Sequence, residues 1–179
     1  MSFSNLGLSD ALINALREQK YEQPYPIQKE AIPAILDGKD ILGIAQTGSG
    51  KTASYVLPIL QQFQTLGSSK NRHIKSLILV PTRELAVQVN EVFKVLGNSL
   101  PNKIKSLAVY GGVSINPQMI ELQGTEILVA TPGRLLELIS TNAVSLSAVK
   151  ILVLDEADKM LNLGFAEEMA KLFSLLPKK

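Results

Sequence analysis

The feature that most constrains this chain is the stretch Ala45-Gln46-Thr47-Gly48-Ser49-Gly50-Lys51-Thr52. It follows the apolar run 41–44 and precedes a segment of helical period at 53–63. A strand, a glycine-bearing turn and a helix are the context that a phosphate-binding loop requires. Gly48 and Gly50 have no Cβ, so the backbone there can adopt positive φ and direct successive N–H groups at one anion. The stretch therefore predicts a site for the phosphates of a nucleotide.

Each part of this loop has an expected task. A helix that begins near Lys51 would add unpaired first-turn amides and a partial positive charge. Lys51 would reach the β- and γ-phosphates, and the Thr52 hydroxyl would bind Mg²⁺. Ala45 departs from the glycine of the general pattern, and an ordinary glycine–serine turn is the alternative interpretation. The residues expected to contact the nucleotide here are Gln46, Thr47, Gly48, Ser49, Gly50, Lys51 and Thr52.

A second motif, Asp155-Glu156-Ala157-Asp158, favours the phosphate loop over the plain turn, and it follows the run 151–154, which is expected to be a buried strand. An unpaired carboxylate at the end of such a strand would cost several kcal/mol of desolvation. Mg²⁺ held by a nucleotide would offset that cost, so Asp155 is expected on the metal side and Glu156 beside the attacking water. A helix N-cap is the alternative for Asp155. We expect Lys51, Asp155 and Glu156 to be catalytic and to serve one magnesium-bound triphosphate.

Composition excludes several classes of protein. The 179 residues suffice for one domain with a core, and no apolar run approaches the roughly 18 residues that span a bilayer. The N-terminus has neither the basic start nor the apolar centre of a signal peptide. The chain has no cysteine, which excludes disulfides and fits a reducing interior. A net charge of +2 does not by itself indicate nucleic acid, so composition predicts a cytoplasmic domain without a membrane or disulfide partner.

Strand-length apolar runs alternate with segments of helical period along the chain. The strands are expected at 40–45, 76–80, 106–110, 126–130 and 149–154. Near-continuous apolar strands separated by helices indicate a parallel sheet that is covered on both faces. We therefore expect an α/β fold, with a mainly parallel sheet and helices on both of its faces.

The helices can be placed from capping residues and apolar periodicity. A first helix is expected over 10–19, a second over 26–38, and the clearest over 82–96. Pro33 falls inside the second helix and should kink it or split it. The polar stretch 64–75 is expected to be a loop.

Unusual strings follow the later strands as well. They are Pro81-Thr82-Arg83-Glu84-Leu85-Ala86, then Gly111-Gly112, then Thr131-Pro132-Gly133-Arg134. In open parallel sheets, ligands bind at the carboxyl ends of the strands. Taken singly, Thr82 and Thr131 are plausible helix N-caps and the two glycines a plain turn. Five such strings at one edge of a sheet favour a shared site over five coincidences.

Together these strings resemble the DEAD-box RNA helicases, in their order and their spacing. The residues that carry the resemblance are Phe3, the string 21–28 (YEQPYPIQ), and the motifs AQTGSGKT, PTRELA, GG, TPGR and DEAD. The overall sequence is similar to that of the bacterial RhlE-like branch. The resemblance covers essentially the whole chain and corresponds to the first of two RecA-like domains in that family. Lys20 stands where the family often has Gly, and Tyr21 where it often has Phe.

The resemblance implies that Gln28 recognises adenine. A primary amide can donate to N7 and accept from the N6 amino group of adenine, whereas guanine presents two acceptors there. That mismatch should cost on the order of 1–3 kcal/mol. Tyr21 would stack on the base, with Phe3 packed behind it. A solvated helix residue is the alternative for Gln28.

The resemblance also implies a path for the RNA backbone. Hydroxyls, glycine amides and an occasional arginine contact phosphate and sugar without reading the bases. In the family Asp158 ties the acidic motif to neighbouring loops and to the second domain. The residues expected along the RNA path are Thr82, Arg83, Gly111, Gly112, Thr131, Pro132, Gly133 and Arg134.

The function implied is that of an ATP-dependent RNA helicase domain, which binds ATP, Mg²⁺ and RNA and, in the full protein, couples hydrolysis to RNA unwinding. Residues 1–38 would recognise adenine and 39–179 would form the phosphate-loop sheet. The sequence stops before the family's Ser-Ala-Thr motif and its C-terminal RecA-like domain, which supplies arginine fingers. A nucleotide-binding fragment with little turnover is therefore one alternative, and another phosphate-loop ATPase is a second.

The same resemblance predicts a gap in the sheet. Family architecture places the missing strand between the strand before the phosphate loop and the strand before the acidic motif. We therefore expect these residues to be a fragment of a longer protein. Either another segment fills the gap, or the strand order differs from that of the family.

Overall fold

The computed structural model describes residues 2–46, 48–66 and 73–178. The chain forms two compact units. The first comprises Met1–Ser68 and Val92–Lys103, and the second comprises Ser69–Glu91 and Ile104–Lys179. Among the described residues the first unit contains helices and no strand, while the second contains the sheet.

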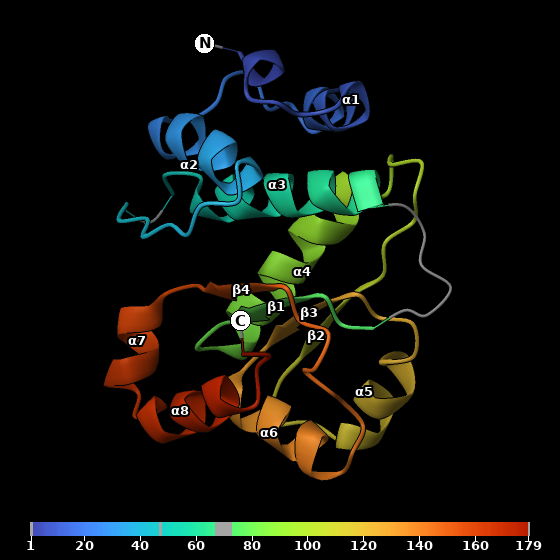
Figure 1. Ribbon diagram of the computed structural model, residues 1–179, viewed down its shortest axis with the longest axis vertical. Coiled ribbons are helices and arrows are strands. Elements are labelled where there is room, and N and C mark those ends of the chain that lie inside the picture. Colours follow the sequence, from blue (N-terminus) through green and yellow to red (C-terminus); the bar gives the residue numbers. More distant parts are fainter. Residues whose placement is uncertain (1, 47, 67–72, 179) are drawn as a thin grey trace. The chain divides into compact units, whose positions relative to one another are not determined.

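The first unit is built from a short 3-10 helix and three α-helices. The bounds are η1 Phe3–Asn5, α1 Asp10–Glu18, α2 Pro26–Leu36 and α3 Lys51–Leu66 (Figure 1). The expected helices at 10–19 and 26–38 are confirmed. Helix α2 packs against α3, and the fully buried side chains of this unit include Leu6, Leu12, Leu16, Ile32, Leu57 and Leu60.

Helix α2 begins and ends as its sequence predicts. Pro26 occupies the first helical turn, where a missing N–H costs nothing, and Gly38 has a φ of 77° just beyond the helix. A kink or a split was expected at Pro33, and the helix runs through this residue without a split. Loss of one backbone hydrogen bond is tolerated there because the apolar face of α2 is buried against α3.

The strand expected at 40–45 is absent. This segment has no regular structure, and the side chains of Leu42 and Ile44 are each 88% exposed. A strand needs a neighbour to satisfy its backbone, and the described residues of the first unit include none. Gly43 weakens the extended conformation further. The loop expected at 64–75 also begins later, because α3 continues to Leu66; residues 67–72 of it lie outside the described residues.

The second unit is organised around a four-stranded parallel sheet. Its strands are β1 Ser76–Leu79, β2 Ser106–Val109, β3 Ile127–Ala130 and β4 Ile151–Leu154. They are arranged in the order β2-β3-β1-β4, and every adjacent pair is parallel. Four of the five expected strands and the α/β fold class are thus confirmed.

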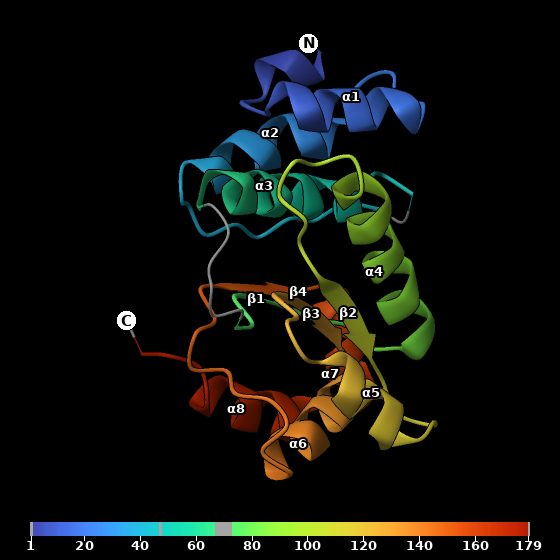
Figure 2. The same cartoon turned by 90° about the vertical axis from the view of Figure 1, so that its right-hand side faces the viewer.

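Helices follow each strand of this sheet. Helix α4, Arg83–Gly97, begins in the second unit and ends in the first. The others are α5 Ile115–Glu121, α6 Pro132–Ser140, α7 Ala157–Asn162 and α8 Ala166–Ser174. Helices α5, α6, α7 and α8 lie on one side of the sheet (Figures 1 and 2).

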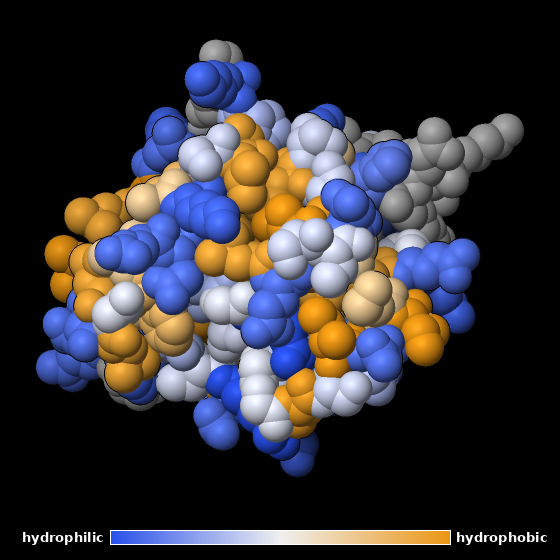
Figure 3. Space-filling view, turned by 90° about the horizontal axis from the view of Figure 1, so that it is seen from below, coloured by the Kyte–Doolittle hydropathy of each residue, from blue (hydrophilic) through white to orange (hydrophobic). Residues whose placement is uncertain are grey.

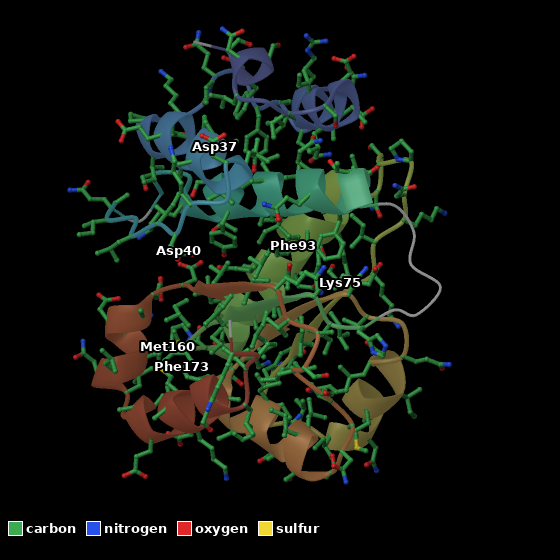
Figure 4. All side chains as sticks on the ribbon, in the orientation of Figure 1. Asp37, Asp40, Lys75, Phe93, Met160 and Phe173 are labelled. Carbon is green, nitrogen blue, oxygen red and sulfur yellow. The ribbon has the colours of Figure 1, made fainter. Side chains whose placement is uncertain are left out.

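The core of the second unit lies between the sheet and these helices. Strands β1 and β3 are buried along their whole length. Met160 of α7 is fully buried in the same cluster, while Phe173 of α8 is 40% exposed (Figure 4). Burying a side chain such as Met160 stabilises the fold by about 1.5–3 kcal/mol. Figure 3 views the molecule from below the orientation of Figure 1, where hydrophobic residues alternate with hydrophilic ones on the surface.

Strand β4 forms one edge of the sheet. Among the described residues it pairs with β1 alone, and Leu152 and Leu154 are each 37% exposed. The strand before the acidic motif is therefore a half-exposed edge strand, and the expectation of a buried strand is wrong. An apolar run predicts a strand without showing whether it has one neighbour or two, because the hydropathy of both is similar.

A buried ion pair lies at the amino ends of the strands. The Nζ atom of Lys75 is 3.1 Å from Oε1 of Glu126, and the two side chains are 17% and 7% exposed. The backbone N–H of Lys75 also donates to the backbone carbonyl of Glu126 across 2.9 Å. The two charges compensate each other where water is largely excluded.

Candidate functional site

The phosphate loop adopts the backbone that its glycines predict. Gly48 and Gly50 have φ values of 82° and 83°, and α3 begins at Lys51 directly after them. A Cβ on Gly50 would collide with Nε2 of Gln28 and lie 2.9 Å from Cδ2 of Tyr25. Glycine at position 50 is thus required by conformation and by space. Thr47, expected to contact the nucleotide, lies outside the described residues.

Lys51 spans the loop that it is expected to serve. Its Nζ donates to the carbonyl of Ala45 across 2.6 Å, so the ammonium group lies over the beginning of the loop. Ser49 carries a buried Oγ that has no hydrogen-bond partner among the described residues. A buried hydroxyl without a partner is costly, and a phosphate oxygen at this loop would satisfy it. The residues present therefore fit a nucleotide phosphate.

Gln28 is fully buried and ties α2 to the phosphate loop. Its Oε1 accepts from the Tyr25 N–H across 2.9 Å, and its Nε2 donates to the Gly50 carbonyl across 3.0 Å. The alternative of a solvated helix residue is therefore wrong, since the side chain has 0% exposure. The amide keeps a second N–H and a second acceptor lone pair, so its use in adenine recognition stays a prediction.

The two aromatic side chains expected near the base lie together. The rings of Phe3 and Tyr21 meet edge to face, with centroids 6.4 Å apart and planes at 72°. Phe3 is buried and Tyr21 is half-buried, so Phe3 packs against Tyr21 as expected. One face of Tyr21 can thereby be fixed for stacking on a base.

The acidic motif directly follows β4 in the second unit. Asp155 is 9% exposed, and its N–H donates to the Leu79 carbonyl across 3.0 Å. Glu156, with φ 52° and ψ 47°, is the N-cap residue of α7. The alternative of an Asp155 N-cap is therefore wrong. Asp158, expected to contact neighbouring loops, is exposed in the first turn of α7.

Glu156 combines a strained backbone with an ion pair. A left-handed conformation costs a residue with a Cβ about 1–2 kcal/mol, and such residues concentrate at functional sites. Its Oε2 lies 3.4 Å from Nζ of Lys159, one helical turn later. The ion pair holds the carboxylate beside the first turn of α7, and the expected role of Glu156 with the attacking water stays a prediction.

The residues after β1 and β3 partly bear out their simpler alternatives. Thr82 Oγ1 accepts from the Leu85 N–H across 3.3 Å, so it caps α4. Thr131 occupies the N-cap position of α6 without a side-chain hydrogen bond, and Pro132 fills the first turn. Neither role excludes a contact with RNA, because both residues lie at helix N-termini that attract anions.

Arg83 and Arg134, both expected on the RNA path, lie in different surroundings. Arg83 is exposed, and its guanidinium lies 5.2 Å from the ring centroid of Tyr110. Arg134 is only 6% exposed; its Nη2 donates to the Val113 carbonyl across 2.7 Å, and its Nε pairs with Glu137 across 2.8 Å. Arg134 is therefore largely committed to the fold, although its Nη1 has no partner among the described residues.

The sequence analysis missed two residues of this region. Tyr110 was expected only as the last residue of a strand and Gln118 was not singled out, yet the hydrogen bonds between them hold the start of the Gly111-Gly112 turn. A lone glutamine on a short helix gives no sequence signal of its own, because its partner is eight residues away.

The described part of the chain contains neither a metal-binding cluster of side chains nor a helix that could span a membrane. Within it, no group of three or more His, Cys, Asp or Glu side chains could hold a metal ion. Mg²⁺ that binds with a nucleotide commonly uses only one or two carboxylates, together with phosphates and waters. No helix described here has both the length and the apolar character needed to cross a membrane.

Known proteins share the sequence and the fold of this chain. The chain is 46% identical to the ATP-dependent RNA helicase CshA of Limosilactobacillus reuteri, over 99% of this chain and 35% of that protein. It is 44% identical to the ATP-dependent rRNA helicase rrp3 of Sclerotinia sclerotiorum, over 99% of this chain and 36% of that protein. The chain thus spans about a third of the length of these relatives.

A solved structure is also similar to this chain in fold and in sequence. The crystal structure of a DEAD box protein from the hyperthermophile Methanococcus jannaschii matches 99% of this chain and 47% of that one, with a TM-score of 0.89 and 39% identity. The DEAD/DEAH box helicase family matches residues 25–179. The parallel sheet, the phosphate loop and the acidic motif are those of a RecA-like domain, and this chain belongs to the DEAD/DEAH box helicase family.

Proposed function

We propose that this chain is the N-terminal RecA-like domain of an ATP-dependent RNA helicase. The observation that carries the proposal is the loop before α3, in which Gly48 and Gly50 adopt left-handed conformations and Lys51 lies over the loop. The names of the relatives support the same activity, since CshA and rrp3 are both called ATP-dependent helicases of RNA or rRNA.

The first unit would bind the nucleotide. The amides of Gly48, Ser49 and Gly50 would receive the β- and γ-phosphates, with Lys51 compensating their charge. Thr52 would hold the Mg²⁺ that accompanies ATP, which supplies charge neutralisation on the transferred phosphate. Adenine would lie against Tyr21, with Phe3 behind that ring and Gln28 reading the base edge.

The second unit would supply the carboxylates and the RNA contacts. We propose that Asp155 serves on the metal side of a bound nucleotide and that Glu156 orients and deprotonates the attacking water. The motif order shared with the family supports this assignment. RNA would be held by amides, hydroxyls and Arg side chains that do not read bases, namely those of Thr82, Arg83, Gly111, Gly112, Thr131, Pro132, Gly133 and Arg134.

The whole protein would need a second RecA-like domain for full activity. The arginine fingers that stabilise charge on the γ-phosphate would come from it, with Asp158 at the contact between the domains. The present residues alone would bind nucleotide with little turnover. A cytoplasmic location belongs to the same proposal.

The test is an ATPase assay with and without RNA, on this chain and on a version extended through a second RecA-like domain. We expect RNA to stimulate the extended protein strongly and this chain hardly at all. Equal turnover by both proteins would contradict the dependence on a second domain. An extended protein that hydrolyses ATP at the same rate with or without RNA would contradict the helicase assignment.

A further inference from the structure

The loop that joins β2 to α5 is held by side chains at both of its ends. It comprises Tyr110, Gly111, Gly112, Val113 and Ser114. Both glycines are exposed, Gly112 has a φ of +78°, and a Cβ on either would meet no atom within 4 Å. The backbone of the turn is therefore open on that side, and its shape depends on what fixes Tyr110 and Val113.

Gln118 fixes the beginning of the loop. Its side chain is 8% exposed; Oε1 accepts from the Tyr110 N–H, and Nε2 donates to the Tyr110 carbonyl, each across 3.1 Å. A primary amide carries the same donor and acceptor as a peptide group. Strand β2 lies at an edge of the sheet, so Gln118 takes the place of a neighbouring strand at the residue where β2 has ended.

Arg134 fixes the end of the loop. Its Nη2 donates to the Val113 carbonyl across 2.7 Å, and the guanidinium is itself oriented by Glu137. The two glycines thus lie between two buried side chains that each bond to the backbone. Neither buried side chain belongs to the loop, so the loop conformation is imposed by α5 and α6.

The same anchor also places a charged side chain. Tyr110, whose backbone Gln118 holds, has the Arg83 guanidinium 5.2 Å from its ring centroid. A cation over an aromatic face is held in a preferred position while its N–H groups stay available to an acceptor. Gln118 is thereby connected to three groups expected on the RNA path, namely Gly111, Gly112 and Arg83.

We propose that Gln118 is a positioning residue for RNA binding. Its amide holds Tyr110 so that the amides of the glycine pair and the Arg83 guanidinium converge on one stretch of RNA backbone. Gln118 itself touches no RNA in this proposal. The inference rests on the proposed RNA-binding function and adds to it the residue that orders the contacts.

The test compares Q118M with Q123M in this chain. Methionine has the length of glutamine and neither hydrogen-bonding group, and Gln123 is an exposed glutamine just beyond α5. The probe is a single-stranded uridine homopolymer, titrated into isotope-labelled protein while the amide resonances of Gly111 and Gly112 are followed. Affinity for ATP and the melting temperature are measured on the same samples.

For Q118M we expect affinity for the RNA to fall about tenfold, because both hydrogen bonds to the backbone of Tyr110 are lost. The glycine resonances should be displaced before RNA is added, while affinity for ATP stays unchanged. Q123M should behave as the unaltered chain. Should Q118M not fold, Q118E with its partner Q123E takes its place, because a carboxylate still accepts from Tyr110 N–H but opposes its carbonyl.

Two results would overturn the positioning role. One is an unaltered RNA affinity in Q118M, and the other is a parallel loss of RNA affinity, ATP affinity and thermal stability, which a purely structural residue would give. If the unaltered chain shows no shift of Gly111 or Gly112 with RNA, the proposed RNA path fails, and the role of Gln118 fails with it. If instead the unaltered chain shows these shifts and Q118M binds RNA equally well, only the role of Gln118 is refuted and the proposed RNA path stands.

Discussion

Gln28 donates from Nε2 to the carbonyl of Gly50 across 3.0 Å, so the residue proposed to read adenine is bonded to the loop proposed to hold phosphate. The contact is close, because any Cβ at position 50 would collide with this amide. A base that bonds to the remaining N–H and acceptor lone pair of Gln28 would therefore influence the position of the loop through a single buried side chain. The proposed recognition of the base and the proposed binding of phosphate would then depend on one hydrogen bond within the first unit.

The first prediction concerns Lys51. K51A should weaken ATP binding roughly a hundredfold, because the charge-assisted contacts of the ammonium with the phosphates are lost. Isothermal calorimetry of this chain measures the effect. The matched control is K39A, which removes an exposed lysine of the same unit and should leave affinity unchanged. Equal ATP affinity in K51A and the unaltered chain would remove the phosphate-loop assignment.

The second prediction concerns Gln28. Q28A should reduce the preference for ATP over GTP by on the order of 1–3 kcal/mol. It should also destabilise the first unit, because the Tyr25 N–H and the Gly50 carbonyl lose their partner. Nucleotide titration and a thermal melt separate the two effects, with the exposed residue Gln23 as control in Q23A. Undiminished discrimination in Q28A would move adenine recognition to another residue.

The third prediction concerns Glu156. In the version extended through a second domain, E156Q should bind ATP normally and lower kcat by about 10²–10⁴-fold, because the amide cannot accept the proton of the attacking water. E91Q, at an exposed position of α4, is the control. Single-turnover kinetics distinguish a slow chemical step from slow release, and normal turnover in E156Q would refute the role.

The fourth prediction concerns Lys20, which has a φ of 59° just after α1. The Lys20 N–H donates to the Arg17 carbonyl and the Tyr21 N–H to the Leu16 carbonyl, which is the hydrogen-bond pattern of a helix ended by a left-handed residue. K20G should raise the free energy of unfolding by about 0.5–1 kcal/mol, because relief of the left-handed strain exceeds the added chain entropy.

The control for Lys20 uses the same substitution in a helix interior. K29G, within α2, should lower the free energy of unfolding by about 1 kcal/mol. Urea denaturation followed by circular dichroism measures both variants. A loss of stability in K20G would show that the lysine side chain contributes more than its backbone conformation costs.

The fifth prediction concerns the ion pair of Lys75 and Glu126. K75M should lower the free energy of unfolding by roughly 3 kcal/mol, because Glu126 is left as an uncompensated buried charge. The double variant K75M/E126Q should recover much of that loss. K39M, which breaks the exposed pair with Asp37, should have little effect. A double variant as unstable as K75M would argue against charge compensation as the cause.

Local sequence patterns predicted the parts of this fold that local physics determines. The positive φ of Gly48 and Gly50 and the start of α3 at Lys51 follow from the glycine spacing and the helical period. The four confirmed strands follow from apolar runs of strand length. The unusual residue at position 20 also has a structural counterpart, since a left-handed conformation is what glycine would supply there.

Other features depend on partners that a local pattern does not contain. The run at 40–45 is as apolar as the true strands, but a strand exists only where a neighbour completes its hydrogen bonds. The left-handed backbone of Glu156 occurs where β4 gives way to α7, and a glutamate has no local preference for that conformation. The role of Gln118 becomes visible only in the structure, where α5 places its side-chain amide against the backbone of Tyr110.

The open flank of β4 has a practical consequence. The N–H groups of Ile151 and Asp155 donate to the carbonyls of Lys75 and Leu79, so the peptide groups of Leu152 and Leu154 point away from β1. No strand in the described part of the chain pairs with them, and such an edge can pair with an extended segment of a second molecule. Concentrated solutions of this chain should therefore aggregate through strand pairing at this edge, and L152K should reduce that aggregation.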